Sequence, residues 1–103
     1  MNLTPHHSDR ARRIAAAITD TACGGLGEWW SSREGLLRRA NTATEIADAI
    51  RPALDLCHHC PAWGACADLA EADRYSGIAA GGVYTRGRRR KLGPAADRQR
   101  GAA

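Results

Sequence analysis

Three of the four cysteines of this 103-residue chain lie in one short segment, CHHCPAWGAC at residues 57–66. The fourth lies far upstream, so the complete pattern is C-x33-C-x2-C-x5-C. Thiols at this density either pair as disulfides or bind metal, and in a reducing compartment metal binding is favoured. Four thiolates suit tetrahedral Zn(II) or an iron–sulfur cluster. The candidate ligands are Cys23, Cys57, Cys60 and Cys66.

The spacing of the cysteines leaves zinc and iron–sulfur both open. Zinc ribbons combine one C-x2-4-C pair with a second close pair, whereas Cys23 has no near partner. Ferredoxins use other short spacings, and the glycine-rich approach to Cys23 supports a cluster. His58 and His59 are zinc ligands by type, but we expect them to be solvent-facing loop residues. Cys57-x2-Cys60 also has the spacing of a thiol–disulfide exchange pair.

The composition indicates one small domain in a reducing compartment. Phe is absent and the apolar content relies on alanine, so the core is small and needs a staple such as a metal. Residues 1–20 carry charges throughout, unlike a signal peptide, and no stretch approaches the roughly 20 apolar residues of a membrane span. We therefore expect a cytoplasmic protein, monomeric and without a membrane partner.

Short helices are expected to position the cysteines. Ser8 or Asp9 can cap a first helix that ends near Thr21 and delivers Cys23 to a glycine-rich segment. A second helical stretch follows and is expected to end near Arg39. Both helices precede the cysteine-rich segment.

The remaining helices are expected to carry the other three thiols. Thr42 and Glu45 form a capping-box pattern for a third helix, which Pro52 is expected to kink or break before Cys57. Pro61 suits the first turn of a fourth helix. The predicted class is all-α: a small bundle of short helices around the four-cysteine site, a glycine-rich turn, and a flexible basic C-terminal tail. The expected division is a domain at residues 1–85 and a DNA-binding tail at 86–103.

Positive charge is concentrated after the glycine-rich segment YSGIAAGGVYT, which is expected to form a tight turn or small hairpin. Residues 86–100 hold seven basic side chains against one acid, a net charge of +6 in a chain of +4. Arg86-Gly87-Arg88 is similar to the centre of an AT-hook without its usual proline, and phosphate binding is the broader expectation. A solvated charge run is the alternative. The DNA-binding candidates are Arg86, Arg88, Arg89, Arg90 and Lys91.

The chain resembles the WhiB-like family of actinobacterial and actinophage iron–sulfur transcription factors in four features. They are the cysteine pattern, the proline directly after Cys60, the glycine-rich turn and the basic C-terminus. The resemblance covers about residues 10–92. It implies a [4Fe-4S] cluster within a bundle of short helices. The ligands that it implies are Cys23, Cys57, Cys60 and Cys66.

The resemblance also implies a protein partner, the C-terminal domain of the principal sigma factor of RNA polymerase. The partner-binding candidates are Gly77, Ile78, Gly81 and Trp63. Ala79 stands where the family has tryptophan, which removes a large apolar contact of the kind that anchors interfaces.

The function predicted from the sequence is a redox-responsive transcriptional regulator that binds a [4Fe-4S] cluster, DNA and the sigma factor. No acid–base pair, nucleotide loop or Ser–His–Asp arrangement is visible, so we expect no enzymatic activity. The alternatives are a zinc-stabilised nucleic-acid-binding module and a thiol–disulfide reductase in the metal-free form.

Overall fold

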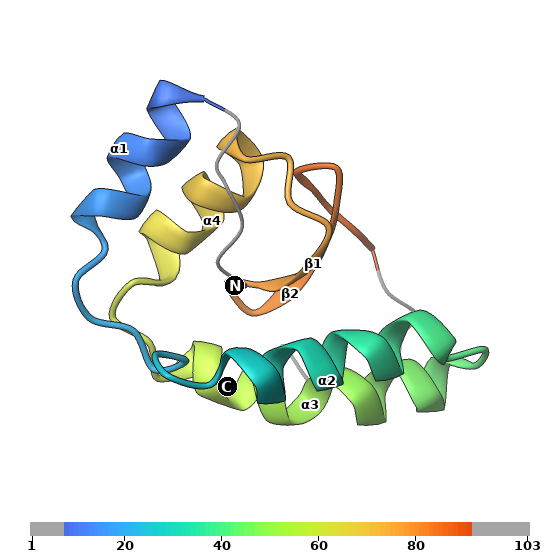
Figure 1. The fold of residues 1–103 in the computed structure, drawn as a ribbon. Helices are drawn as coiled ribbons and strands as arrows, with labels where there is room; N and C mark the ends of the chain where they lie inside the picture. The colour runs from blue at the N-terminus through green and yellow to red at the C-terminus, as the bar shows by residue number, and fades with distance from the viewer. Residues whose placement is uncertain (1–7, 92–103) are drawn as a thin grey trace.

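The computed structural model describes residues 8–91, which form four helices followed by a small sheet (Figure 1). The elements are α1 (Asp9–Ala17), α2 (Gly27–Arg39), α3 (Ala43–His58), α4 (Trp63–Ala72), β1 (Gly77–Ala79), β2 (Gly82–Thr85) and β3 (Arg88–Arg89). The expectation of a mostly helical protein is confirmed. The all-α class is wrong in one respect, because the glycine-rich segment and the basic residues after it form an antiparallel sheet of order β1-β2-β3.

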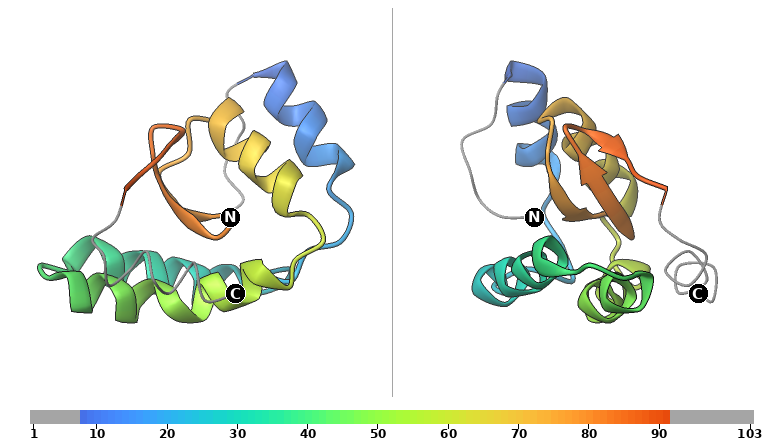
Figure 2. Two further views of the ribbon diagram at one scale, coloured as in Figure 1. Left: turned by 180° about the vertical axis from the view of Figure 1, so that it is seen from behind. Right: turned by 90° about the vertical axis from the view of Figure 1, so that its right-hand side faces the viewer.

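The helices pack as two pairs, with the sheet beside them (Figures 1 and 2). One pair is α1 with α4, the other is α2 with α3, and β1 contacts both α3 and α4. The main core lies between the α2–α3 pair and the sheet; its buried members are Trp30, Ala47, Ala49, Ile50, Ala53, Leu54, Cys57, Ile78 and Val83. A smaller cluster of Ala70, Ala79 and Tyr84 joins α4 to the sheet.

Local capping signals start two helices where the sequence predicts them. The Ser8 hydroxyl accepts a hydrogen bond from the backbone amide three residues later at 3.1 Å, and Thr42 does the same at the start of α3. The first helix ends at Ala17, earlier than the expected Thr21. The longer connection that results carries Cys23 toward the cysteines of the second half of the chain.

The third helix continues through Pro52, so the expected break does not occur. A proline within a helix removes the hydrogen bond to the carbonyl four residues earlier, here that of Asp48. Arg33 of α2 donates to this carbonyl from Nη2 at 2.7 Å and to the carbonyl of Ala49 from Nε at 2.9 Å. A side chain of the neighbouring helix therefore replaces the bond that the proline removes.

Replacing Arg33 with methionine is expected to lower the free energy of unfolding by about 1 kcal/mol, because the Asp48 carbonyl loses its donor. The same replacement in a Pro52→Ala background is expected to cost less, since the restored amide at position 52 bonds to that carbonyl. Urea unfolding of the two single variants and the double variant measures the coupling. Equal costs of Arg33→Met in both backgrounds would contradict this account.

Two side chains of α2 hold strand β1 through the backbone carbonyl and amide of Ile78. Trp30 donates from Nε1 to the carbonyl of Ile78 at 2.9 Å, and the Ile78 amide donates to Oε2 of Glu34 at 2.6 Å. The Tyr75 hydroxyl donates to the same carboxylate oxygen at 2.5 Å. The Glu34 side chain is buried, with 4% of the residue exposed, so its charge is balanced by hydrogen bonds. These contacts fix the position of the turn that follows β1.

Candidate metal centre

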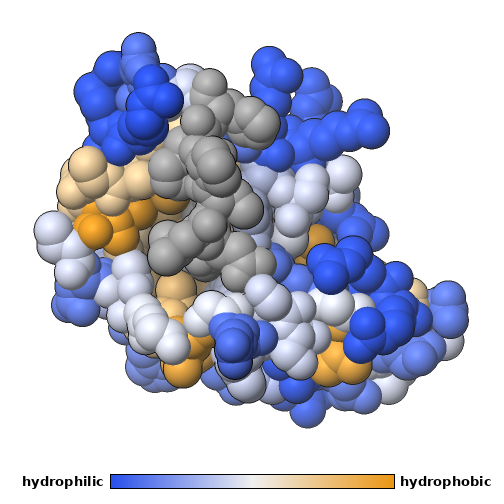
Figure 3. All heavy atoms as spheres, viewed as in Figure 1, coloured by the Kyte–Doolittle hydropathy of each residue, from blue (hydrophilic) through white to orange (hydrophobic). Residues whose placement is uncertain are grey.

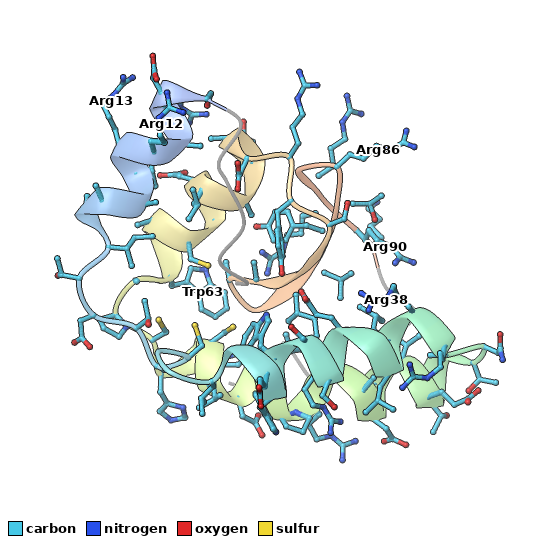
Figure 4. All side chains as sticks on the ribbon, in the orientation of Figure 1. Arg12, Arg13, Arg38, Trp63, Arg86 and Arg90 are labelled. Atoms are coloured by element: carbon cyan, nitrogen blue, oxygen red, sulfur yellow. The ribbon has the colours of Figure 1, made fainter. Side chains whose placement is uncertain are left out.

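All four cysteines line one cavity of about 800 Å³ at the junction of the two helix pairs. Cys23 comes from the α1–α2 connection, Cys57 from the last turn of α3, and Cys60 and Cys66 from the start of the α4 region. All are free thiols, and only Cys57 is fully buried. The sulfur atoms in Figure 4 gather near the labelled Trp63. The four cysteines that the sequence predicts as ligands thus line the same cavity, and their role as ligands stays a prediction.

The rest of the cavity wall is mostly apolar side chains and glycine backbone, with Thr21 and Glu28 as polar members. Gly25 adopts a left-handed φ of 79°, which glycine accepts without strain and which turns the chain directly after Cys23. The large apolar side chains in the wall are Ile18, Leu26, Trp29, Trp30, Leu56, Trp63 and Leu69. These side chains make most of the wall hydrophobic, and the glycine backbone leaves room beside Cys23.

Burial is the main influence on the thiols themselves. Burial raises the pKa of Cys57 from 9.0 to about 11, and the other three cysteines add to this rise. A backbone hydrogen bond from Gly81 acts in the opposite direction and lowers the pKa of Cys57. Burial also raises the pKa of Cys66, and a backbone hydrogen bond from Ala80 opposes that rise. These thiols therefore keep their protons at neutral pH in the metal-free protein, and binding a metal must release them.

The β1–β2 turn contacts the cavity through its backbone. Ala80 and Gly81 both have left-handed φ values, 46° and 69°, as a two-residue hairpin turn of the I′ type requires. Their amides are the donors to Cys66 and Cys57. A Cβ on Gly81 would overlap the Trp63 ring, so glycine is needed both for the turn and for the packing. Sequence inspection did not assign these amides to the site, because backbone donors carry no residue-type signal.

Replacing Gly81 with alanine is expected to destabilise the metal-free protein by about 2–4 kcal/mol, because the methyl group displaces Trp63 and the left-handed backbone is strained. Gly64→Ala is the matched control, since no atom lies within 4 Å of a Cβ built there and alanine favours helix α4. Urea unfolding compares the two. A similar stability change in both variants would contradict the close packing of Trp63 on the turn.

Two helices begin at the cavity without a side-chain cap. They are α2, which starts at Gly27, and α4, which starts at Trp63; both of these residues line the cavity. The helices that start elsewhere are capped by Ser8 and Thr42. Uncapped N-terminal ends carry partial positive charge, which favours anionic sulfur over neutral thiol.

The four thiols surround a space and do not converge on a single point. Among residues 8–91, no group of three or more His, Cys, Asp or Glu side chains lies close enough to hold one metal ion. A zinc ion would require its sulfur ligands at about 2.3 Å from one point.

The two histidines between the candidate ligands have different surroundings. His58 is the last residue of α3, and its ring packs edge-on against Trp63 with centroids 5.5 Å apart. Its Nε2 is buried and has no hydrogen-bond partner in the part of the chain that the structure describes. His59 is exposed, with Nδ1 2.9 Å from the carbonyl of Asp55. The solvent-facing loop expected for both therefore holds for His59 and is wrong for His58.

Two of the four predicted partner-binding residues are buried. Ile78 has no exposed surface and Gly81 is buried, whereas Gly77 and Trp63 are half-buried. Ala79, at the position of the family tryptophan, is also fully buried. Sigma-factor binding by this turn stays a prediction, and a tryptophan at position 79 would have to displace core atoms.

The basic residues 86–91 belong to the fold and do not start a flexible tail. Arg86 and Gly87 form the β2–β3 turn with left-handed φ values of 51° and 81°, so this segment is not the extended backbone of an AT-hook. The Gly87 amide donates to the carbonyl of Tyr75, and the Arg86 amide donates to the Ser76 hydroxyl, both at 2.9 Å. Residues 92–103 of the predicted tail lie outside the described residues.

The basic side chains form an exposed surface on one side of the molecule. All five are exposed. Four of them form no side-chain hydrogen bond or ion pair with any of residues 8–91; they are Arg86, Arg88, Arg90 and Lys91. Arg38 at the end of α2 lies on the same side as Arg86 and Arg90 (Figure 4), where hydrophilic residues cover the surface (Figure 3). Sequence inspection missed Arg38 because it is far from the basic run in the chain.

Arg89 differs from the other basic residues of the run. Its Nη1 donates to the carbonyl of Ala80 at 3.0 Å and to the hydroxyl of Tyr84 at 3.1 Å. The guanidinium also lies over the Tyr84 ring, 5.6 Å from its centroid. These contacts direct the charged group toward the β1–β2 turn, so Arg89 is a weaker DNA-contact candidate than its neighbours.

Comparison of the chain with models of protein families, with curated proteins and with solved structures finds no match. Within residues 8–91, no helix combines the length and apolar character needed to cross a membrane.

Proposed function

We propose that this protein binds a [4Fe-4S] cluster and DNA and acts as a redox-responsive transcriptional regulator. The observation that carries the proposal is the shared cavity, which is lined by cysteines from separate segments of the chain. The cluster ligands would be Cys23, Cys57, Cys60 and Cys66. The resemblance of the cysteine spacing to that of the WhiB-like family supports the same assignment.

The residues around the cavity fit an anionic cluster. Backbone amides from the β1–β2 turn donate to two of the sulfurs, and the uncapped starts of α2 and α4 add partial positive charge. Most of the wall is apolar. When bound, such a cluster supplies one-electron redox chemistry and sensitivity to oxidants.

The exposed basic surface supports the DNA-binding part of the proposal. Arg86, Arg88, Arg90 and Lys91 have no side-chain partners among the described residues, so their charges are available to phosphates. Arg38 adds a charge from a different element on the same side (Figure 4). Sigma-factor binding is not needed for this proposal, and Trp63 is the largest candidate side chain that remains half-exposed for it.

The alternatives receive less support from the geometry. A single zinc ion would require at least three of these thiols to move to one point, since no such group is present among residues 8–91. A thiol–disulfide reductase needs a thiol with a lowered pKa, whereas burial raises that of Cys57 to about 11. Both alternatives use the same thiols, so the metal content of the protein distinguishes them from the proposal.

Anaerobic reconstitution with iron and sulfide tests the cluster. We expect a brown protein that contains about four iron and four sulfide atoms per chain and bleaches on exposure to oxidants. A colourless product with one zinc per chain would overturn the cluster proposal in favour of zinc. A product with no bound metal and reversible Cys57–Cys60 oxidation would favour the reductase.

A further inference from the structure

One arginine of the basic run is built into the turn that contacts the cluster cavity. The β2–β3 register places Arg89 opposite Tyr84, and its guanidinium reaches back to the carbonyl of Ala80. A Cβ on Gly82 would lie 2.8 Å from Cζ of Arg89, so the absence of a side chain there makes room for the guanidinium. The position of Arg89 therefore depends on the β1–β2 turn and on strand β2, which follows it.

The same turn bonds to two cysteines. Its two residues donate backbone hydrogen bonds to the sulfurs of Cys66 and Cys57, while the Ala80 carbonyl accepts from Arg89. Ala80 thus contacts a ligand sulfur through its amide and the basic strand through its carbonyl. A movement of either sulfur that breaks its hydrogen bond frees the peptide units of the turn.

Strand β3 connects Arg89 to the residues proposed to bind DNA. Arg88 precedes it in the strand and pairs with Thr85, and the Arg90 amide donates to the carbonyl of Val83 at 2.8 Å. Because β3 is only two residues long, few backbone hydrogen bonds hold it on the sheet. The side-chain contacts of Arg89 are a large part of what fixes the strand.

We infer that Arg89 is a positioning residue that links the cysteine cavity to the DNA-binding surface. It braces the β1–β2 turn against Cys57 and Cys66, and it fixes the strand that carries Arg88 and Arg90. The part of this inference that concerns DNA and the cluster rests on the proposed function. The brace itself rests only on the contacts of Arg89.

The test compares Arg89→Met with Arg88→Met, because each removes one positive charge from the same strand. In the metal-free protein, amide hydrogen exchange at Ala80 and Gly81 is measured by NMR. We expect exchange at both amides to be at least several-fold faster in Arg89→Met and unchanged in Arg88→Met. Tyr84→Phe, which removes only the phenol oxygen, is the milder variant and is expected to give a smaller increase. This measurement requires neither cluster nor DNA.

A second measurement concerns the coupling. In wild type, the affinity for a duplex DNA is compared between the reconstituted and the metal-free protein. The ratio of the two affinities is expected to move toward one in Arg89→Met and to persist in Arg88→Met, although the latter binds DNA more weakly in both forms. Failure of the wild type to take up iron or to bind DNA would overturn the proposed function. The hydrogen-exchange result would still test whether Arg89 fixes the β1–β2 turn.

Two outcomes would overturn the role of Arg89. The first is that the amides of Ala80 and Gly81 exchange as slowly in Arg89→Met and Tyr84→Phe as in the wild type. The other is equal acceleration in Arg89→Met and Arg88→Met, which would indicate a general effect of charge or stability on the sheet. If Arg89→Met does not fold, the Tyr84→Phe result decides between these outcomes.

Discussion

Replacing Cys23 with serine is expected to abolish cluster loading, with iron falling from about four atoms per chain to near none after anaerobic reconstitution. Cys23 is the one cysteine outside the 57–66 segment, and it joins the α1–α2 connection to the cavity. Without it, three thiols remain and the cluster lacks its fourth ligand. Because the core is small and rich in alanine, part of the helix content is expected to be lost with the metal.

Iron and sulfide analysis together with circular dichroism measures both effects. His59→Gln is the control, since this residue lies between two ligands but is exposed and contacts the carbonyl of Asp55. It is expected to load iron as the wild type does. A Cys23→Ser protein with full iron and undiminished helix content would remove Cys23 from the ligand set. Loss of iron in His59→Gln would indicate that His59 is a ligand, although it does not line the cavity.

The four thiols could be found from the sequence because cysteine is rare and its chemistry is specific to the residue type. The spacing of Cys57, Cys60 and Cys66 places them around the end of one helix and the start of the next, which local rules predict. The convergence of Cys23 with the others depends on tertiary packing. The number of cysteines suggested that Cys23 joins the other three, the family resemblance implied the same set, and all four line one cavity.

Features that depend on partners distant in the chain could not be predicted. The break expected at Pro52 assumed that its lost hydrogen bond stays lost, but Arg33 from another helix supplies the donor. The burial of Ala79 depends on Tyr84 and Ala70, which pack against it from β2 and α4. At both places the tertiary environment, and not local propensity, decided the outcome.

The basic run shows a different limit, which comes from strand register. Arg88 and Arg89 have the same side chain, yet they point to opposite faces because side chains alternate along a strand. Both are exposed, but Arg88 has no side-chain partner among residues 8–91, whereas Arg89 lies over Tyr84. A sequence identifies the run as basic, but only the register shows which charges remain available to DNA.

Removing three exposed charges of this run is expected to weaken DNA binding steeply. The variant is Arg86→Gln, Arg88→Gln and Arg90→Gln together; it keeps Arg89 and its contacts with the turn. Each phosphate contact contributes about −0.9 to the slope of log affinity against log salt, so loss of three contacts flattens the slope by roughly three units. Iron content is expected to stay unchanged, because none of the three residues lines the cavity.

The control removes the same net charge from another element, through Arg10→Gln, Arg12→Gln and Arg13→Gln on α1. Arg12 and Arg13 lie at the far end of the molecule from Arg90 (Figure 4), so the slope is expected to remain that of the wild type. Electrophoretic titrations at several salt concentrations measure both variants. Because Arg86 and Gly87 form a left-handed turn, no preference for A·T-rich duplex is expected. Equal flattening in both variants would mean that net charge, and not this surface, holds the DNA; an unchanged slope in the first would place the contacts elsewhere on the protein.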